Sequence, residues 1–231
     1  MRNSSSSTIT RLRWLSCVII LVMPSVSRAA WTITSEQADA PKDVAGAIRE
    51  LLDHTCLTVK DGDATIAEFW LRSELPSSAD ADQIKNGVSW KEIPETTILG
   101  VVRLPKAFVD YRKQEIPAGL YTLRLAMQPD TGDHKDTAPH GEFALLSPAG
   151  KDRLPETIEA KDLVKLSRTT TGSDHPAVML IFPAKKAVAE PKLVDKGNGV
   201  QVVELMRTVN ANGTFSKLGF AITVGGVSKS R

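Results

Sequence analysis

Functional side chains are concentrated in the segment from residue 127 to residue 143, MQPDTGDHKDTAPHGEF, which lies between two apolar runs. Zinc is bound in proteins by three or four nitrogen, sulfur or oxygen ligands in a tetrahedral arrangement, and catalytic sites leave one position open. Two histidines on opposite limbs of the loop could converge with nearby aspartates, and Glu142 could serve as a base. One hypothesis is therefore a metal-binding protein or metal-dependent hydrolase in which the 130–142 loop supplies the ligands Asp133, His134, Asp136 and His140.

The same segment is also typical of a polar hairpin loop that binds no cofactor. Residues 130–133 combine aspartate, threonine and glycine, which form turns stabilised by side-chain hydrogen bonds to the backbone. The sequence contains no compact zinc motif such as H-E-x-x-H or C-x-x-C, and only four histidines, of which His175 could supply a third ligand. For a calcium site, the segment lacks the D-x-[DN]-x-[DN]-G order whose oxygens surround the ion. The pattern favours the turn, with zinc and calcium sites as the alternatives.

Other catalytic and binding chemistries have weaker support in the sequence. No G-x-S-x-G nucleophile elbow occurs, and the segment GVSWK at 87–91 lacks the last glycine. Cys56 lies among strand-forming residues and is predicted to be a buried structural thiol. Aromatic residues make up only 5% of the chain, and Trp70 and Trp90 have apolar neighbours, which predicts core packing rather than sugar binding. The residues therefore favour a protein that is not an enzyme.

The N-terminus has the organisation of a secretory signal peptide. A basic start is followed by an apolar run over residues 14–22 and by small residues near position 29. The apolar run is shorter than the roughly 20 residues of a transmembrane helix. We expect cleavage after Ala29, which divides the chain into a signal peptide, residues 1–29, and one domain, residues 30–231. The mature protein is then expected to be exported, periplasmic or extracellular, without stable membrane insertion.

Charge and cysteine content narrow the range of partners. The chain has 29 basic and 27 acidic residues, and the predicted signal peptide contains four arginines and no acidic residue. Subtracting 4 from 29 leaves 25 basic residues against 27 acidic ones, a formal charge of −2 for the mature chain. This charge does not indicate nucleic acid binding, and the sequence contains no basic cluster interleaved with aromatic residues, which such binding would require. Since Cys56 alone would remain, no intramolecular disulfide is expected, and the core must stabilise the fold.

The elements expected around the polar loop are mostly short strands. Residues 42–54 repeat apolar side chains at helical spacing and predict one amphipathic helix. Asp61-Gly62 and Asn212-Gly213 predict two β-hairpins, because glycine accepts the positive φ that tight hairpin turns require. A short helix is expected over residues 159–170 and a loop over residues 184–199.

The strand that leads into the polar loop has an alternating pattern. One predicted face is apolar and should belong to the core, and it carries Tyr121, Leu123, Leu125 and Met127. The other face should be wet, and it carries Thr122, Arg124 and Gln128. Many short strands, few helices and no β-α-β alternation predict an antiparallel β-sandwich with one N-terminal helix and one or two short helical insertions.

Five blocks of the sequence resemble a group of exported bacterial β-rich proteins of unknown function. The blocks are AEFWLR at 67–72, LGVVRL at 99–104, IPAGLYTLRLAMQPDTGDH at 116–134, FALLSPAGKD at 143–152 and HPAVMLIFP at 175–183. The resemblance implies export and a β-rich fold, and it implies no activity or functional residues. Together with the residue patterns, it favours an exported non-enzymatic β-sandwich that acts as a binding, envelope-associated or structural interaction module, with an envelope or extracellular partner whose identity is unknown.

Overall fold

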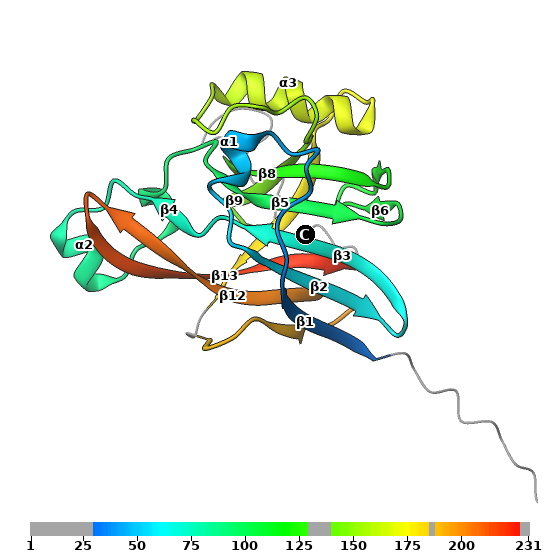
Figure 1. The fold of residues 1–231 in the computed structure, drawn as a ribbon, viewed down its shortest axis with the longest axis horizontal. Helices are drawn as coiled ribbons and strands as arrows, with labels where there is room; N and C mark the ends of the chain where they lie inside the picture. The colour runs from blue at the N-terminus through cyan, green and yellow to red at the C-terminus, as the bar shows by residue number, and fades with distance from the viewer. Residues whose placement is uncertain (1–29, 129–139, 185–187, 227–231) are drawn as a thin grey trace, which may run out of the picture.

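The computed structural model describes residues 30–128, 140–184 and 188–226, and within them the chain is mainly β (Figure 1). The strands are β1 (Trp31–Gln37), β2 (Thr55–Asp61), β3 (Ala64–Leu71), β4 (Glu74–Pro76), β5 (Ile98–Leu104), β6 (Phe108–Val109), β7 (Glu115–Ile116), β8 (Gly119–Met127), β9 (Glu142–Pro148), β10 (Ala177–Pro183), β11 (Lys192–Asp195), β12 (Gln201–Ala211) and β13 (Thr214–Gly225). The helices are α1 (Gly46–Arg49), α2 (Ala81–Asn86), the 3₁₀ turn η1 (Trp90–Glu92) and α3 (Ala160–Thr171).

All strands except β6 and β7 form one large curled sheet. Its order is β1-β2-β3-β5-β8-β9-β10-β13-β12-β11, and β4 pairs with β12 in parallel, so the sheet is mixed. Strand β10 continues from one half of the sheet into the other, because Ala177–Leu180 pair with β9 whereas Ile181–Pro183 pair with β13. The predicted mainly-β class is confirmed. A two-layered sandwich of purely antiparallel strands is not, since a single sheet curls around the core and contains one parallel pair.

The curl of the sheet encloses the main hydrophobic core. Leu123 and Leu125 of β8 and Leu146 of β9 are fully buried there. Trp90 of η1 inserts its ring edge-on against Phe220 of β13, with 4.9 Å between the ring centroids. Burial of these side chains removes apolar surface from water, which is the main favourable contribution to folding. Core packing of Trp70 and Trp90 was predicted, and both are confirmed as buried, at 4% and 5% exposure.

The helix predicted over residues 42–54 is wrong in length. Only Gly46–Arg49 are helical, although Val44 and Ile48 are buried as the periodicity indicates. After this turn the backbone is extended and pairs at the end of β3, where Leu52 forms an antiparallel bridge with Arg72. Such a short helix is marginal in water and depends on tertiary packing.

The local turn predictions are confirmed. Gly62 has a φ of +58° between β2 and β3, and Asn212 and Gly213 have φ of +51° and +89° between β12 and β13. Helix α3 also forms where expected and ends at Gly172, which has a left-handed φ of +65°. The loop expected over residues 184–199 instead contains β11, which pairs with β12. Within the described ranges, no helix is both long enough and apolar enough to cross a membrane.

Candidate functional site

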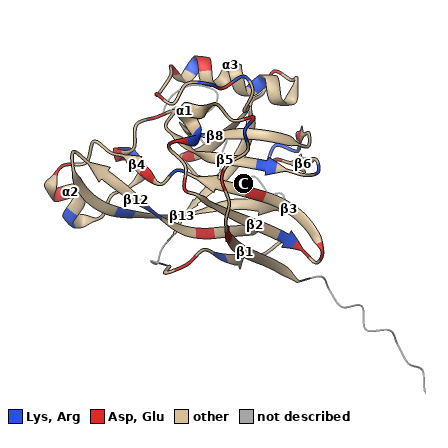
Figure 2. Cartoon of the chain, viewed as in Figure 1, with Lys and Arg blue, Asp and Glu red and all other residues tan. Residues whose placement is uncertain are grey.

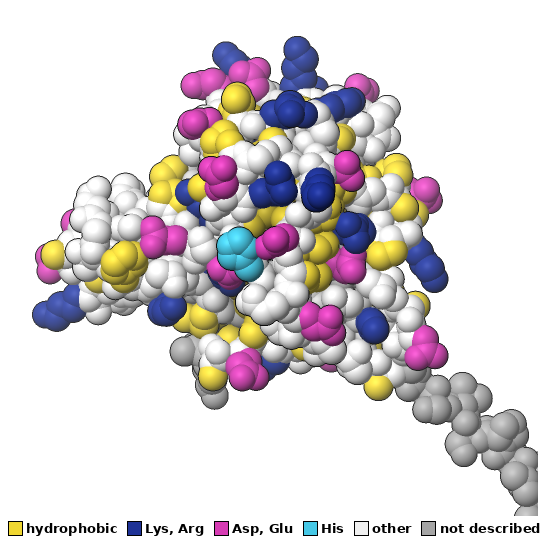
Figure 3. Space-filling view, viewed as in Figure 1, with side chains coloured by type: hydrophobic (Ala, Val, Ile, Leu, Met, Phe, Trp, Pro, Cys, Tyr) yellow, Lys and Arg dark blue, Asp and Glu magenta, His cyan; other side chains and the backbone are white. Residues whose placement is uncertain are grey.

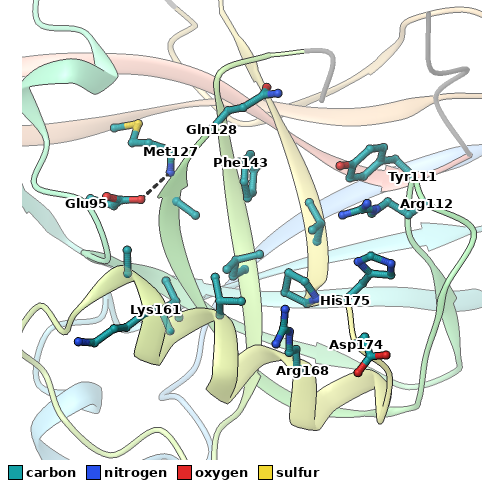
Figure 4. Close-up of a pocket in the computed structure, with 17 residues that line it drawn as sticks. Glu95, Tyr111, Arg112, Met127, Gln128, Phe143, Lys161, Arg168, Asp174 and His175 are labelled. Atoms are coloured by element: carbon teal, nitrogen blue, oxygen red, sulfur yellow. Dashed lines mark hydrogen bonds between the residues drawn. The ribbon is translucent and has the colours of Figure 1, made fainter. Parts of the chain in front are cut away.

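A pocket of about 700 Å³ lies between α3 and the face of β8, β9 and β10 that points away from the main core (Figure 4). Its floor is apolar, and polar groups are found towards its ends. The apolar side chains of the floor include Ala126, Phe143, Leu145, Leu163, Val164 and Val178, and the side chains around it include Glu95, Tyr111, Arg112, Lys161, Arg168, Asp174 and His175. The volume falls within the roughly 300–1,000 Å³ typical of small-molecule sites.

The sheet contributes the floor because successive side chains of a strand point to opposite faces. On β9, Ala144 and Leu146 belong to the main core, whereas Phe143 and Leu145 face α3. Leu163 of α3 is buried against the same face. The strand that precedes the polar loop and the strand that follows it therefore both supply one wall of the pocket.

Hydrogen bonds fix α3 across this face of the sheet. Ser167 Oγ and Thr170 Oγ1 both donate to the backbone oxygen of Leu146, at 2.8 and 3.0 Å. At the other end, Thr96 Oγ1 donates to the Ile158 oxygen at 2.8 Å, and the Ile158 amide donates back to it at 2.9 Å. These bonds tie α3 to β9 and tie the segment that precedes α3 to the turn before β5, so the pocket is present without a ligand.

A buried aspartate holds the opposite rim. Asp110 is 1% exposed and accepts hydrogen bonds from the backbone amides of Arg112 and Gln114, both at 2.9 Å. It also accepts from Gln114 Nε2 at 3.0 Å and from the Val178 amide at 3.4 Å, which joins the turn to β10. Burial raises the pKa of Asp110, and these hydrogen bonds oppose that rise. The turn that carries Arg112 is thus anchored to the pocket floor.

Charge is distributed unevenly around the pocket. Figure 4 places Arg112 and His175 at one end, with Arg168 rising from α3, whereas Glu95 and Lys161 lie towards the other end. Glu95 Oε1 accepts a hydrogen bond from the Met127 amide at 3.0 Å. Within the part of the chain that the structure describes, Arg112 and Arg168 form no ion pair and their guanidinium groups have no hydrogen-bond partner. One end of the pocket therefore offers unpaired guanidinium groups.

Charges of both signs are mixed in the views of Figures 2 and 3. Basic and acidic residues alternate along the elements in Figure 2, and both signs are interspersed on the face shown in Figure 3. The face shown in Figure 3 therefore carries no broad surface of one sign.

The strand face predicted to be wet is buried, and this corrects the interpretation of Arg124. Its side chain is 0% exposed and forms a two-point ion pair with Asp152, at 2.8 Å from Nε and 2.9 Å from Nη2. Its remaining donors bind the backbone oxygens of Thr96 and Glu156, at 2.8 and 2.9 Å, and that of Leu154. These bonds join Arg124 to the segments around β8. Because all five of its N–H groups are used, Arg124 has no donor left for a ligand.

The loop proposed as a metal site lies largely outside the described residues. Asp133, His134 and Asp136 fall there, whereas His140 is half-buried with its ring edge-on to Phe182, 4.8 Å between centroids. Glu142 lies on β9, opposite Met127. In the ranges that the structure covers, no three His, Cys, Asp or Glu side chains group to hold a metal ion. The zinc and calcium alternatives therefore remain predictions.

Sequence patterns missed most of the pocket. His175, which the sequence offers as a possible third metal ligand, lines the pocket. Arg112 and Arg168 belong to no motif, and their places in the pocket lining depend on the turn held by Asp110 and on the packing of α3. The amphipathic pattern over residues 159–170 was the one available signal, and it indicated a buried face without indicating a cavity.

Cys56 is a buried thiol, as predicted, with 6% exposure. Burial raises the pKa of the thiol above its ordinary value of 9.0. Because the thiolate is the reactive form, we expect the folded protein spanning residues 30–231 to react with iodoacetamide at pH 8 at least about a hundredfold more slowly than the unfolded chain.

Mass spectrometry of quenched aliquots measures that rate for the single thiol. The control is a Thr32→Cys variant in a Cys56→Ser background, which places a thiol at an exposed position of β1 and should react at once. Equal rates for Cys56 in the folded and unfolded states would contradict its structural role.

Comparisons of the chain with known protein families, with curated proteins and with solved structures found no match in any of the three.

Proposed function

We propose that this protein is a non-enzymatic binding module that holds a small, largely apolar molecule in the pocket beneath α3. The observation that carries the proposal is a preformed cavity of about 700 Å³ with an apolar floor and few polar groups. Ligand sites of small molecules have this combination of concavity, apolar lining and sparse polar groups. The hydrogen bonds of Ser167 and Thr170 keep the site open without a ligand, which lowers the ordering cost of binding.

The composition of the lining supports binding rather than catalysis. Among the described residues around the pocket there is no serine, threonine or cysteine that could act as a nucleophile. Tyr111 is held in its neutral form, because burial raises the pKa of its phenol above 10.0. The lining therefore offers contact area and charge more readily than a nucleophile activated by a base.

We propose further that binding takes place outside the cytoplasm. The signal-peptide pattern of residues 1–29 supports export to the periplasm or the extracellular space, with residues 30–231 as one mature domain. The two halves of the curled sheet that meet at β10 are proposed to act as the layers of a sandwich. Neither nucleic acid nor a stable membrane insertion is expected, and an envelope or extracellular molecule is the proposed partner.

The test is binding of N-phenyl-1-naphthylamine, an uncharged apolar dye whose fluorescence rises in apolar sites. We expect saturable binding to the protein spanning residues 30–231, and a loss of at least about tenfold in affinity in a Val164→Trp variant. Val164 is half-buried and lines the pocket from α3, so an indole there fills space that the dye would occupy.

Val109→Trp is the matched control, because Val109 is 44% exposed and does not line the pocket. Dye affinity should be unchanged in this variant, and thermal unfolding should show that both variants are folded. Absence of saturable binding, or equal affinity in all three proteins, would contradict the proposed function.

A further inference from the structure

We infer that the ligand of the α3 pocket is an amphipathic anion, a single aliphatic chain that ends in a carboxylate or phosphate group bound by Arg112 and Arg168. This inference rests on the proposed function and adds the chemical class of the ligand. The argument combines the unpaired guanidinium groups, the position of the acidic residues and the shape of the apolar floor.

Two arginines from different elements converge on the same cavity. Arg112 comes from the turn between β6 and β7, and Arg168 comes from the last turn of α3. A guanidinium group presents a planar set of donors that matches the two oxygens of a carboxylate or phosphate. Ordinary surface arginines often find a carboxylate, as Arg103 does with Glu68 at 3.0 Å. Arg112 and Arg168 have no such partner among the described residues, which leaves their donors available to an anionic ligand.

The backbone from which these two side chains extend is fixed in advance. The backbone amide of Arg112 is held by the buried carboxylate of Asp110, and the Arg168 turn is held by Ser167 on the sheet. With the backbone fixed, only the two side chains have to be ordered when an anion binds, which lowers the conformational entropy cost. His175 lines the same end of the pocket and adds a ring N–H that can donate to an oxyanion.

The acidic residues define the direction in which such a ligand would lie. Glu95 is at the end opposite Arg112, and its carboxylate already accepts a hydrogen bond from the Met127 amide. Lys161 lies towards that end as well, so a second anionic group there would meet charges of both signs, whereas the other end offers two guanidinium groups. A molecule with one charged end fits this distribution better than a dianion with charges at both ends. Asp174 is exposed beside His175 and reduces the positive charge of the cationic end without removing it.

Between the two ends the floor is suited to hydrocarbon. Phe143 and Leu145 of β9, Val164 of α3 and Val178 of β10 line a continuous apolar stretch. An aliphatic chain on this stretch leaves no polar atom of its own unsatisfied, whereas a polar chain would lose hydrogen bonds to water. The pocket therefore combines the two recognition elements that an amphipathic anion requires.

The test is calorimetric titration of the protein spanning residues 30–231 with dodecanoate, dodecyl phosphate and 1-dodecanol, each kept monomeric. We expect the affinity of each anion to be at least about tenfold higher than that of the alcohol of equal chain length. Decanoate should bind more weakly than dodecanoate by about fourfold for each methylene removed. Inorganic phosphate alone should bind at least about a hundredfold more weakly than dodecyl phosphate.

The Arg112→Gln/Arg168→Gln double variant should lose about tenfold in affinity for dodecanoate and none for dodecanol. Lys165→Gln is the matched control, because this exposed lysine of α3 carries the same charge and does not line the pocket; its affinities should be unchanged. Dodecanol binding as tightly as dodecanoate, or an unchanged preference in the double variant, would overturn the anion assignment while leaving the binding function intact. Inorganic phosphate binding as tightly as dodecyl phosphate would overturn the need for a chain. Failure of every chain and of the uncharged dye would overturn the proposed function itself.

Discussion

Replacement of Arg124 by alanine is expected to lower the free energy of unfolding by about 3–5 kcal/mol, measured by guanidinium denaturation. The substitution leaves the carboxylate of Asp152 buried without its cation, at 3% exposure. It also removes the donors to three backbone oxygens, those of Thr96, Leu154 and Glu156. Removing one partner of a buried pair destabilises the protein by more than the intact pair stabilises it, because the remaining group stays dehydrated without a hydrogen bond in compensation.

The matched control is Arg103→Ala on the neighbouring strand β5. Arg103 is paired with Glu68 at 3.0 Å, but its side chain is 44% exposed, so its loss should cost no more than about 1 kcal/mol. Similar effects of the two arginine substitutions would show that the Arg124 network does not stabilise the fold. Where Arg124→Ala fails to fold, Asp152→Asn keeps the shape of the side chain and permits the same measurement.

A paired substitution separates the ion pair from the backbone contacts. In an Arg124→Met/Asp152→Leu variant neither charge remains, and replacing a buried ion pair by apolar residues is often neutral. We nevertheless expect only partial recovery relative to Arg124→Ala, because the Thr96 and Glu156 oxygens still lack their donors. Complete recovery would mean that these oxygens find water or other donors.

The second large effect is expected for Phe220→Ala, at about 3–5 kcal/mol lost from the free energy of unfolding. Phe220 is 1% exposed in the main core, and its ring packs edge-on against Trp90 at 4.9 Å. The substitution removes apolar contact on β13 and leaves a cavity beside the η1 turn. Near-ultraviolet circular dichroism should also lose signal, because the environment of Trp90 becomes less asymmetric.

Phe215→Ala is the control for this prediction, since it makes the same change on the same strand. Phe215 is 61% exposed near the hairpin tip, so its replacement should alter stability by no more than about 0.5 kcal/mol. Equal losses for Phe215 and Phe220 would contradict the assignment of the core to the inside of the curled sheet.

The candidate site could be predicted from the sequence only in fragments. The histidines and aspartates of the loop over residues 130–142 predict a candidate metal site, but Asp133, His134 and Asp136 lie outside the described residues. The pocket is built from the strands on either side of that loop and from α3. Its cationic end depends on Arg112 and Arg168, whose separation in the sequence gives no local pattern to detect.

The sequence by itself determined the local elements of this protein. The hairpins at Asp61-Gly62 and Asn212-Gly213, the helix near residues 160–171 and the burial of Cys56 follow from backbone and side-chain preferences within a few residues. Only the tertiary structure decided which faces are covered. Alternation separates Arg124 from Leu125 on β8, but it cannot show that Asp152, 28 residues away, will bury the arginine. Contacts between distant segments likewise shortened α1, curled the sheet and opened the pocket beneath α3, because these features depend on long-range packing that no short stretch of sequence contains.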